Sequence, residues 1–249
     1  MSRRADQLRL LPDLPAVEPR NPLAGLSVSG LVAYGRCPRQ CYWSVIEPRP
    51  RPASPSARVG SLIHGWIERR ACGQGSLLAV ESPAAGCPSP DPMARLQAAF
   101  LASPYGELAP LAVERPFAVT VGEAVVRGRV DALYHRTGRF EVVDFKTGNR
   151  PCADDRAAGL QLDLYALAAV DAWGRAPEEV RTTEWYLAAG QGCSRDFDAG
   201  EISRVRERVA LVLEGLAVGR FAPEPGSYCT RCAFLGLCRT GRVALEGSH

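Results

Sequence analysis

Two aspartates and the only lysine of the chain lie close together in the middle of the sequence. Asp131 lies in the stretch GRVDALY, and Asp144 and Lys146 lie in VVDFKTG, whereas the other 29 of the 30 basic residues are arginine. Residues i and i+2 of a β-strand project on the same side, so Asp144 and Lys146 are expected to lie together. Neighbouring carboxylates repel unless a cation lies between them, and Mg²⁺ prefers oxygen ligands that include phosphate. The pattern indicates metal-assisted phosphate chemistry, and an exposed ion pair at a strand end is the alternative.

Three further polar residues have spacings that could place them near this site. His64 lies in GSLIHGWIE, where Gly60, His64 and Glu68 recur every fourth residue and therefore share one face of a helix. Gln161 and Tyr165 are also four residues apart, in an otherwise apolar helix that could direct both at one end of the sheet. A single histidine on a helix is more often structural than a ligand, and the Gln–Tyr pair could lie at the edge of the core. Their interpretation depends on the residues around them.

Three cysteines near the end of the chain have the spacing of a metal site. Cys229, Cys232 and Cys238 form a C-x₂-C-x₅-C pattern, and the stretch RCPRQC offers Cys37 as a fourth ligand with Cys41 as its competitor. Four thiolates bind Zn²⁺ or an iron–sulfur cluster, and the spacing does not separate the two. A distant fourth ligand would join the two ends of the domain. Some of these residues could instead be buried apolar cysteines.

The periodicity of hydrophobic residues predicts helices on both sides of a central group of strands. Helices are expected over 27–43, 57–70, 93–102, 159–173 and 199–218. Strands are expected over 111–121, 124–134, 139–146 and 181–188, the first three forming an antiparallel meander. A hairpin around Gly138 would bring Asp131 and Asp144 to one end of the sheet. The order of elements predicts an α/β or α+β fold, with a mixed sheet flanked by helices.

Length and composition exclude several classes of protein. With 249 residues, 46% of them hydrophobic, and a net charge of +3, the chain is neither disordered nor strongly charged. No run of about 18 apolar residues predicts a membrane span, and the start of the chain has no secretory signal pattern. Nine cysteines, an odd number, favour reduced thiols and a cytoplasmic location. We expect a tail or linker over 1–25, one domain over 26–240 and a tail over 241–249.

Six motifs in a fixed order resemble a known family. They are CPR, GxxxH, GRVD, VVDFKTG, QLDLYALA and C-x₂-C-x₅-C. This order resembles the RecB-like, iron–sulfur branch of the PD-(D/E)xK nucleases, which have a restriction-endonuclease-like core. It is similar to the nuclease domains of AddB-type and actinobacterial UvrD-like helicase–nucleases, and to the CRISPR-associated RecB-like exonucleases.

The resemblance implies roles for the residues in these motifs. It implies that Mg²⁺ or Mn²⁺ is held by His64, Asp131, Asp144 and the carbonyl of Phe145. It implies that Lys146 is the catalytic lysine, and that Gln161 and Tyr165 support the active site and contact DNA. It also implies a [4Fe–4S] cluster held by Cys37, Cys229, Cys232 and Cys238.

Two positions relate to the family pattern more loosely. Glu114, in VERPF, lies where some members have an acidic residue. Cys41 departs from the pattern, because many relatives have another residue there, and it leaves the fourth cluster ligand ambiguous.

The expected function is metal-dependent hydrolysis of DNA, with exonuclease action on single strands or duplex ends in repair or recombination. The chain has no Walker motif, so it is expected to be either a free-standing nuclease or one domain or subunit of a helicase–nuclease. The alternatives are a catalytically silent strand-guiding module, a CRISPR-adaptation exonuclease and a zinc-stabilised interaction protein. Surface arginines near the cysteines could contact phosphates; these are Arg36, Arg39, Arg231 and Arg239.

Overall fold

The computed structural model describes residues 24–51, 55–73, 91–148, 157 and 159–247. The strands are β1 (Ala24–Ser27), β2 (Ala112–Val121), β3 (Ala124–Arg136), β4 (Arg139–Lys146), β5 (Val180–Tyr186) and β6 (Gln191–Asp196). The helices are α1 (Val28–Arg36), α2 (Pro38–Cys41), α3 (Pro55–Ala71), α4 (Pro92–Leu101), α5 (Leu160–Leu167), α6 (Ala199–Ala217) and α7 (Arg239–Glu246).

The six strands form one mixed sheet in the order β1-β3-β4-β5-β6, and β2 pairs with β3 outside this path. The pairs β2–β3, β3–β4 and β5–β6 are antiparallel, whereas β1–β3 and β4–β5 are parallel. β1 and β4 share one edge of β3: β1 pairs with the first residues of β3, and β4 pairs with its last residues. β2 pairs with β3 along the other edge. The predicted meander and mixed sheet are confirmed. The short edge strands β1 and β6 were not predicted.

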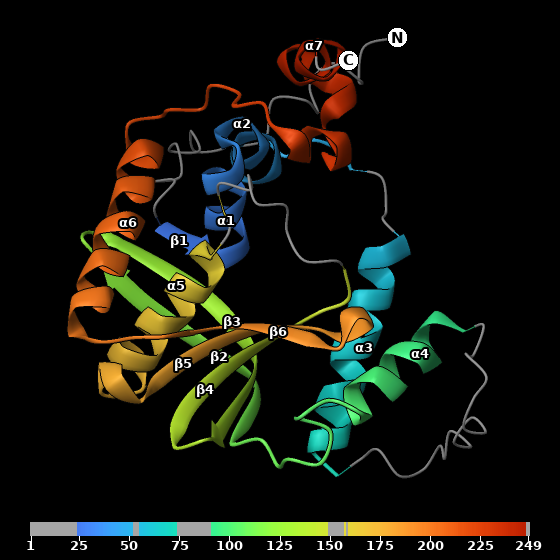
Figure 1. The fold of residues 1–249 in the computed structure, drawn as a ribbon. Coiled ribbons are helices and arrows are strands. Elements are labelled where there is room, and N and C mark those ends of the chain that lie inside the picture. Colours follow the sequence, from blue (N-terminus) through green and yellow to red (C-terminus); the bar gives the residue numbers. More distant parts are fainter. Residues whose placement is uncertain (1–23, 52–54, 74–90, 149–156, 158, 248–249) are drawn as a thin grey trace, which may run out of the picture.

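Helices cover both faces of the sheet and bury two separate hydrophobic cores. The larger core joins the sheet to α1, α5 and α6, and the smaller one joins it to α3 and α4. Val142 belongs to the larger core and its neighbour Val143 to the smaller one, so the two cores lie on opposite faces of β4. In Figure 1, α3 and α4 accordingly lie together on one side, away from α5 and α6.

The helix predicted over 27–43 is broken at Cys37, where the prediction was wrong. Ser27 caps the N-terminus of α1, because its hydroxyl accepts a hydrogen bond from the N–H of Gly30 at 3.0 Å. Cys37 is extended, with φ −158° and ψ 113°, since the proline ring of Pro38 disfavours a helical conformation in the preceding residue. The break separates α1 from α2 and releases Cys37 from the helix.

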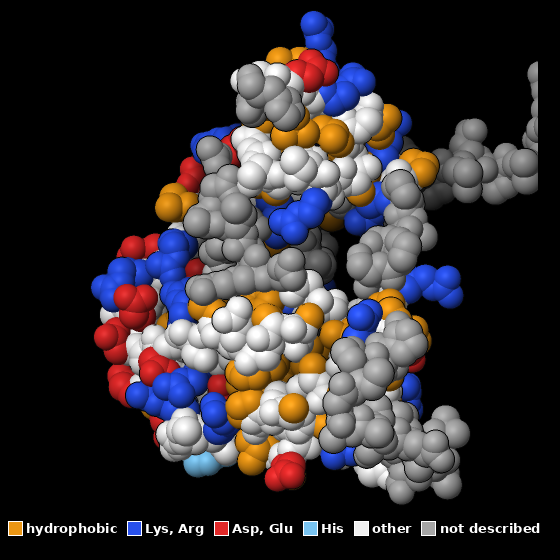
Figure 2. Space-filling model, turned by 45° about the vertical axis from the view of Figure 1, so that its right-hand side comes forward, with side chains coloured by type: hydrophobic (Ala, Val, Ile, Leu, Met, Phe, Trp, Pro, Cys, Tyr) orange, Lys and Arg blue, Asp and Glu red, His pale blue; other side chains and the backbone are white. Residues whose placement is uncertain are grey.

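The ends of the described chain also differ from the expected tails. Residues 24 and 25 belong to β1, and 1–23 lie outside the described residues. Residues 241–246, expected as tail, belong to α7. No helix within the described ranges is long and apolar enough to cross a bilayer. Basic and acidic side chains are mixed along one flank of the face drawn in Figure 2, in keeping with the small net charge.

Candidate active site and cysteine cluster

The alternation of side chains in the β2–β3 hairpin reverses at Glu114 and Asp131. In β2, Phe117 faces the larger core but Val113 faces the smaller one, although both are odd-numbered. Glu114 has a left-handed backbone with φ 48°, which is uncommon for a residue other than glycine and accounts for the reversal. The register of the hairpin, in which Val113 pairs with Ala132, places Glu114 opposite Asp131. The two carboxylates therefore lie side by side at the point where the hairpin changes faces.

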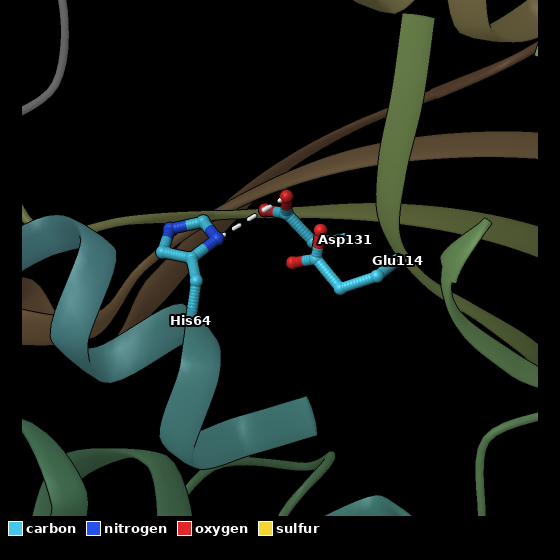
Figure 3. Close-up of side chains that lie close together, drawn as sticks. All are labelled: His64, Glu114 and Asp131. Atoms are coloured by element: carbon cyan, nitrogen blue, oxygen red, sulfur yellow. Dashed lines mark ion pairs between the residues drawn. The ribbon is translucent and has the colours of Figure 1, made fainter. Parts of the chain in front are cut away.

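His64 of α3 completes a group of three possible metal ligands with Glu114 and Asp131. One ligand atom from each lies within 4.8 Å of the others, and Figure 3 shows the three side chains pointing toward one another. His64 Nδ1 is 3.2 Å from Asp131 Oδ1, and the N–H of Phe145 donates to Asp131 Oδ2 at 2.8 Å. The carboxylate of Glu114 is also 2.6 Å from Nε of Arg129.

The charges of this group perturb its pKa values. Burial lowers the pKa of His64, but the hydrogen bond to Asp131 and nearby negative charges outweigh it and raise the pKa overall. Burial raises the pKa of Glu114 against the opposing charge of Arg129. The neighbouring charges of Asp131 and Glu68 raise the pKa of Glu114 further, and a cation bound between the carboxylates would oppose this repulsion.

A second network joins the end of β4 to α5. Lys146 Nζ is 2.7 Å from Asp144 Oδ2 and donates to Gln161 Oε1 at 2.7 Å. Gln161 Nε2 in turn donates to Asp144 Oδ1 at 2.7 Å, and the Tyr165 hydroxyl is 3.2 Å from the same oxygen. Burial, together with the charge of Asp131, raises the pKa of Asp144 to about 6 despite the neighbouring Lys146. The two networks thus meet through Asp131 and Asp144 on neighbouring strands.

A buried carboxylate fixes the position of α5. Asp163, which is 4% exposed, lies 2.5 Å from Arg195 Nη1 on β6 and 3.1 Å from Arg208 Nη2 on α6. Because Asp163 lies between Gln161 and Tyr165 in the sequence, these pairs hold the helix that presents both residues to Asp144. The interior position requires such pairing, since an unpaired buried carboxylate is costly.

The structure brings all six residues predicted for the catalytic site into these two networks, and it adds others. Glu114, assigned more loosely, lies within the His64–Asp131 group, whereas Asp144 faces Lys146 and Gln161. Phe145 contributes its N–H to Asp131, whereas the family resemblance implies a role for its carbonyl. Glu184 was also missed: it lies opposite Asp144 in the β4–β5 register and accepts a hydrogen bond from Tyr186 at 2.6 Å. The sequence feature that could reveal Glu184 is an acidic residue within a buried strand, and this feature points to the site only when the strand pairing is known.

The donor set fits a hard divalent cation. Carboxylate oxygens are the ligands that Mg²⁺ and Mn²⁺ prefer, whereas an imidazole is a more usual ligand of transition metals. Asp144 Oδ2 pairs with Lys146 Nζ at 2.7 Å, and a carboxylate oxygen has a second lone pair that can bind a further partner. These oxygens and His64 would hold the ion.

The four predicted cysteine ligands line one small cavity at the junction of α1 with the C-terminal segment. Arg39 and Trp43 line it as well, beside Cys37, Cys229, Cys232 and Cys238. Main-chain N–H groups point at three of the sulfurs: Glu224 at Cys37, Gly226 at Cys229 and Gly241 at Cys238, at 3.4–3.5 Å. Burial and the neighbouring thiols raise the pKa of Cys232. N–H groups directed at sulfur fit thiolates that ligate a metal or cluster.

Cys41 does not share this cavity. It is fully buried in the larger core, where burial raises the pKa of its thiol to about 11. A thiol with so high a pKa behaves as a small apolar side chain. The geometry therefore favours Cys37 over Cys41 as the fourth member of the set.

The arginines expected to contact phosphates near the cysteines are not all directed outward. Arg39 lies over the rings of Tyr42 and Trp43, at 5.4 and 5.5 Å. Arg231 and Arg239 are exposed, and Arg36 is half-buried. Stacking occupies the face of the Arg39 guanidinium but leaves its edge open to other partners.

Comparison with known proteins places most of the chain in one family. A sequence model of the PD-(D/E)XK nuclease superfamily matches residues 25–239. The Gene 69 proteins of Mycobacterium phages D29 and L5 are each 32% identical over 120 residues, or 46% of this chain. The alignment spans 42% of the D29 protein and 39% of the L5 protein, so the chain matches about two fifths of these relatives.

Two solved structures share the fold over nearly the whole chain. One is SSO0001, with a TM-score of 0.51 and 16% identity, covering 91% of this chain and 89% of that one. The other is a protein from Eubacterium rectale whose name suggests an exonuclease, with a TM-score of 0.52, 13% identity and coverage of 93% and 92%. At these identities the likeness is one of fold.

Proposed function

The chain belongs to the PD-(D/E)XK nuclease superfamily, and from that premise we propose that it hydrolyses DNA phosphodiester bonds with Mg²⁺ or Mn²⁺. One observation carries this proposal: Lys146 lies 2.7 Å from Asp144 at the end of β4, next to the group His64, Glu114 and Asp131. Carboxylates, an imidazole and an ammonium at one strand end are the groups that metal-assisted phosphate hydrolysis needs.

The side chains divide the work. A divalent cation held by His64, Asp131 and Asp144, with Glu114 beside them, would lower the pKa of a bound water and offset phosphate charge. Lys146 has a raised pKa: burial lowers it, but the charge of Asp144 and its hydrogen bond outweigh the burial. Lys146 is therefore an ammonium at neutral pH, suited to orient a water and to stabilise negative charge on the phosphate rather than to remove a proton. Gln161 holds Lys146 and Asp144 in place through one amide.

We further propose that the cysteine cavity holds a [4Fe–4S] cluster rather than zinc. Four sulfurs bound tetrahedrally to one Zn²⁺ at about 2.3 Å are roughly 3.8 Å apart. Within the described part of the chain, no three of the four cysteine sulfurs lie within 4.8 Å of one another. The wider spacing suits a larger cofactor. Anaerobically purified protein should be brown and contain iron and sulfide, whereas a colourless protein with one zinc would contradict this assignment.

The biological setting is proposed from the resemblance of the motifs. We place the nuclease in DNA repair or recombination, acting as an exonuclease, with a helicase as partner domain or subunit. A CRISPR-adaptation exonuclease remains the alternative setting for the same chemistry.

The test is cleavage of end-labelled single-stranded and duplex DNA by anaerobically purified protein. We expect degradation with Mg²⁺ or Mn²⁺, none in EDTA, and progressive shortening from one end. Mn²⁺ binding measured by calorimetry should weaken in His64→Ala. Protein that binds DNA and Mn²⁺ but cleaves with neither metal would instead support the strand-guiding module.

A further inference from the structure

One face of the β2–β3 hairpin is covered over only half its length. Glu114 and Asp131 divide this face into two halves. The half away from the β2–β3 turn, with Val113 and Ala132, is covered by α3 and α4 and packs into the smaller core. Toward the hairpin turn the same face is exposed. We call this half the open face; its residues are Pro116, Ala118, Thr120, Arg127 and Arg129.

The glycine between the two arginines fixes the direction of their side chains. A Cβ on Gly128 would lie 2.6 Å from Phe117 and from Val28, so the Gly128 position faces the larger core. Neighbouring residues of a strand point to opposite sides, and Arg127 and Arg129 therefore point out of the open face. The β2 residues paired with them, Ala118 and Pro116, are small and uncharged. The open face therefore has small uncharged side chains on β2 and arginine side chains on β3.

The candidate metal group lies at the step between the covered and the open halves. Arg129 is 65% exposed, and its Nε is 2.6 Å from Glu114, whose carboxylate is 14% exposed. Glu114 belongs to the group with His64 and Asp131. A chain lying on the open face would therefore reach the metal ligands at its end, directly after passing Arg129.

We propose that one strand of the DNA substrate lies along the open face, with Arg127 and Arg129 contacting successive phosphates and Arg129 delivering the backbone to the metal group. This proposal rests on the function proposed above. Two residues along a β-strand cover about 6.7 Å, which is close to the separation of successive phosphates in an extended nucleic-acid strand. Guanidinium groups bind phosphate well, and small neighbours let the backbone approach.

Arg129 has two alternative partners, the carboxylate of Glu114 and a phosphate of the DNA. Without DNA, the guanidinium offsets the charge of Glu114. A phosphate arriving beside the metal group would compete for the same guanidinium, and it would leave Glu114 to face the group that contains His64 and Asp131. Arg127 is exposed and serves as a phosphate contact only.

The test measures binding of a labelled single-stranded oligonucleotide in EDTA at several salt concentrations. Arg127→Ala and Arg129→Ala should each weaken binding several-fold and reduce the slope of log affinity against log salt by about 0.7, the value for one phosphate contact. Arg204→Ala is the matched control, because Arg204 is 57% exposed and paired with Glu201 on α6. It should bind like the wild type.

Glu114→Gln separates a phosphate contact from support of Glu114. This variant removes the partner of Arg129 but keeps the guanidinium, so metal-free binding should be unchanged or tighter. Wild-type-like binding by Arg129→Ala would overturn the proposal, as would the absence of wild-type binding in EDTA. If an arginine variant changes the molar mass of the protein in solution but not its DNA binding, the proposal is also overturned. A second copy of the chain would then cover the open face.

Failure of this proposal can be told apart from failure of the proposed function. Cleavage by the wild type with Mg²⁺, together with wild-type binding by both arginine variants, overturns only the strand path. Arginine-dependent binding without any cleavage supports the strand path and contradicts the nuclease.

Discussion

The acidic site and the cysteine cavity are built in different ways. The acidic site is assembled on neighbouring strands and two packed helices, and its side chains already contact one another: Lys146 with Asp144, Gln161 with both, and His64 with Asp131. The cysteines come from the end of α1 and from short turns after α6, almost 200 residues apart in the chain. Their sulfurs contact main-chain N–H groups rather than one another.

This difference indicates where each region obtains its order. The acidic site is held by the sheet and by the Asp163 ion pairs, so it should keep its shape without a metal. The C-terminal segment is held by a few aromatic contacts, such as Trp43 with Phe234 and Tyr42 with Phe221. We infer that catalysis depends on the first region and that stability depends on what the second region binds.

The largest expected effect tests the catalytic half of the comparison. Asp131→Asn should reduce cleavage roughly a thousandfold, because it removes a charged ligand and leaves the neighbouring groups in place. The amide oxygen can still accept the hydrogen bond from Phe145, so the unfolding temperature should change little. Single-turnover cleavage rates and thermal unfolding measure the two effects. A variant that cleaves at the wild-type rate would break the comparison.

The next effect tests the stabilising half. Cys37→Ser should destabilise the protein by about 4 kcal/mol, because Cys37 is the ligand that joins α1 to the C-terminal segment and its loss opens a long closed loop. For a chain of this size that corresponds to a fall of roughly 10 °C in unfolding temperature. Cys72→Ser is the control, because Cys72 is exposed and does not line the cysteine cavity. Equal unfolding temperatures for the two variants would remove the stabilising role.

A pH series sharpens the account of the acidic site. The folded protein keeps the Asp144 proton up to a pKa of about 6, whereas an unfolded aspartate releases it near 3.8. The free energy of unfolding should therefore contain a contribution that falls as pH rises between these values. Urea unfolding in EDTA should show this slope in the wild type and a flatter one in Asp144→Asn. Parallel curves would mean that Asp144 is not held in this environment.

The smallest effect concerns the backbone of Glu114. Because its φ is 48°, Glu114→Gly should be more stable than Glu114→Ala by about 1 kcal/mol, while both lose the carboxylate. At Arg115, whose φ is not positive, the order of glycine and alanine should be reversed. Chemical denaturation of the four variants measures the difference. Equal stabilities at Glu114 would argue against the strained conformation.

The sequence predicts the parts of this molecule that depend on local patterns. The meander, the mixed sheet and the spacing of Gln161 and Tyr165 on α5 follow from periodicity. The association of Asp131 with Asp144 follows from the hairpin around Gly138. Residues placed by tertiary geometry were harder to foresee. Arg129 and Glu184 gain meaning only from strand pairing, and Asp163 only from the packing of α6 against α5. The break at Cys37 follows from a local signal, because Pro38 disfavours a helical conformation in the residue before it.

The most direct test of the central claim is the rate of Mg²⁺-dependent DNA cleavage by folded Lys146→Ala protein beside the wild type. If Lys146 stabilises charge on the phosphate, the variant should bind DNA, unfold at a similar temperature and cleave at least a hundredfold more slowly. Cleavage by this variant at the wild-type rate would contradict the assignment of the active site.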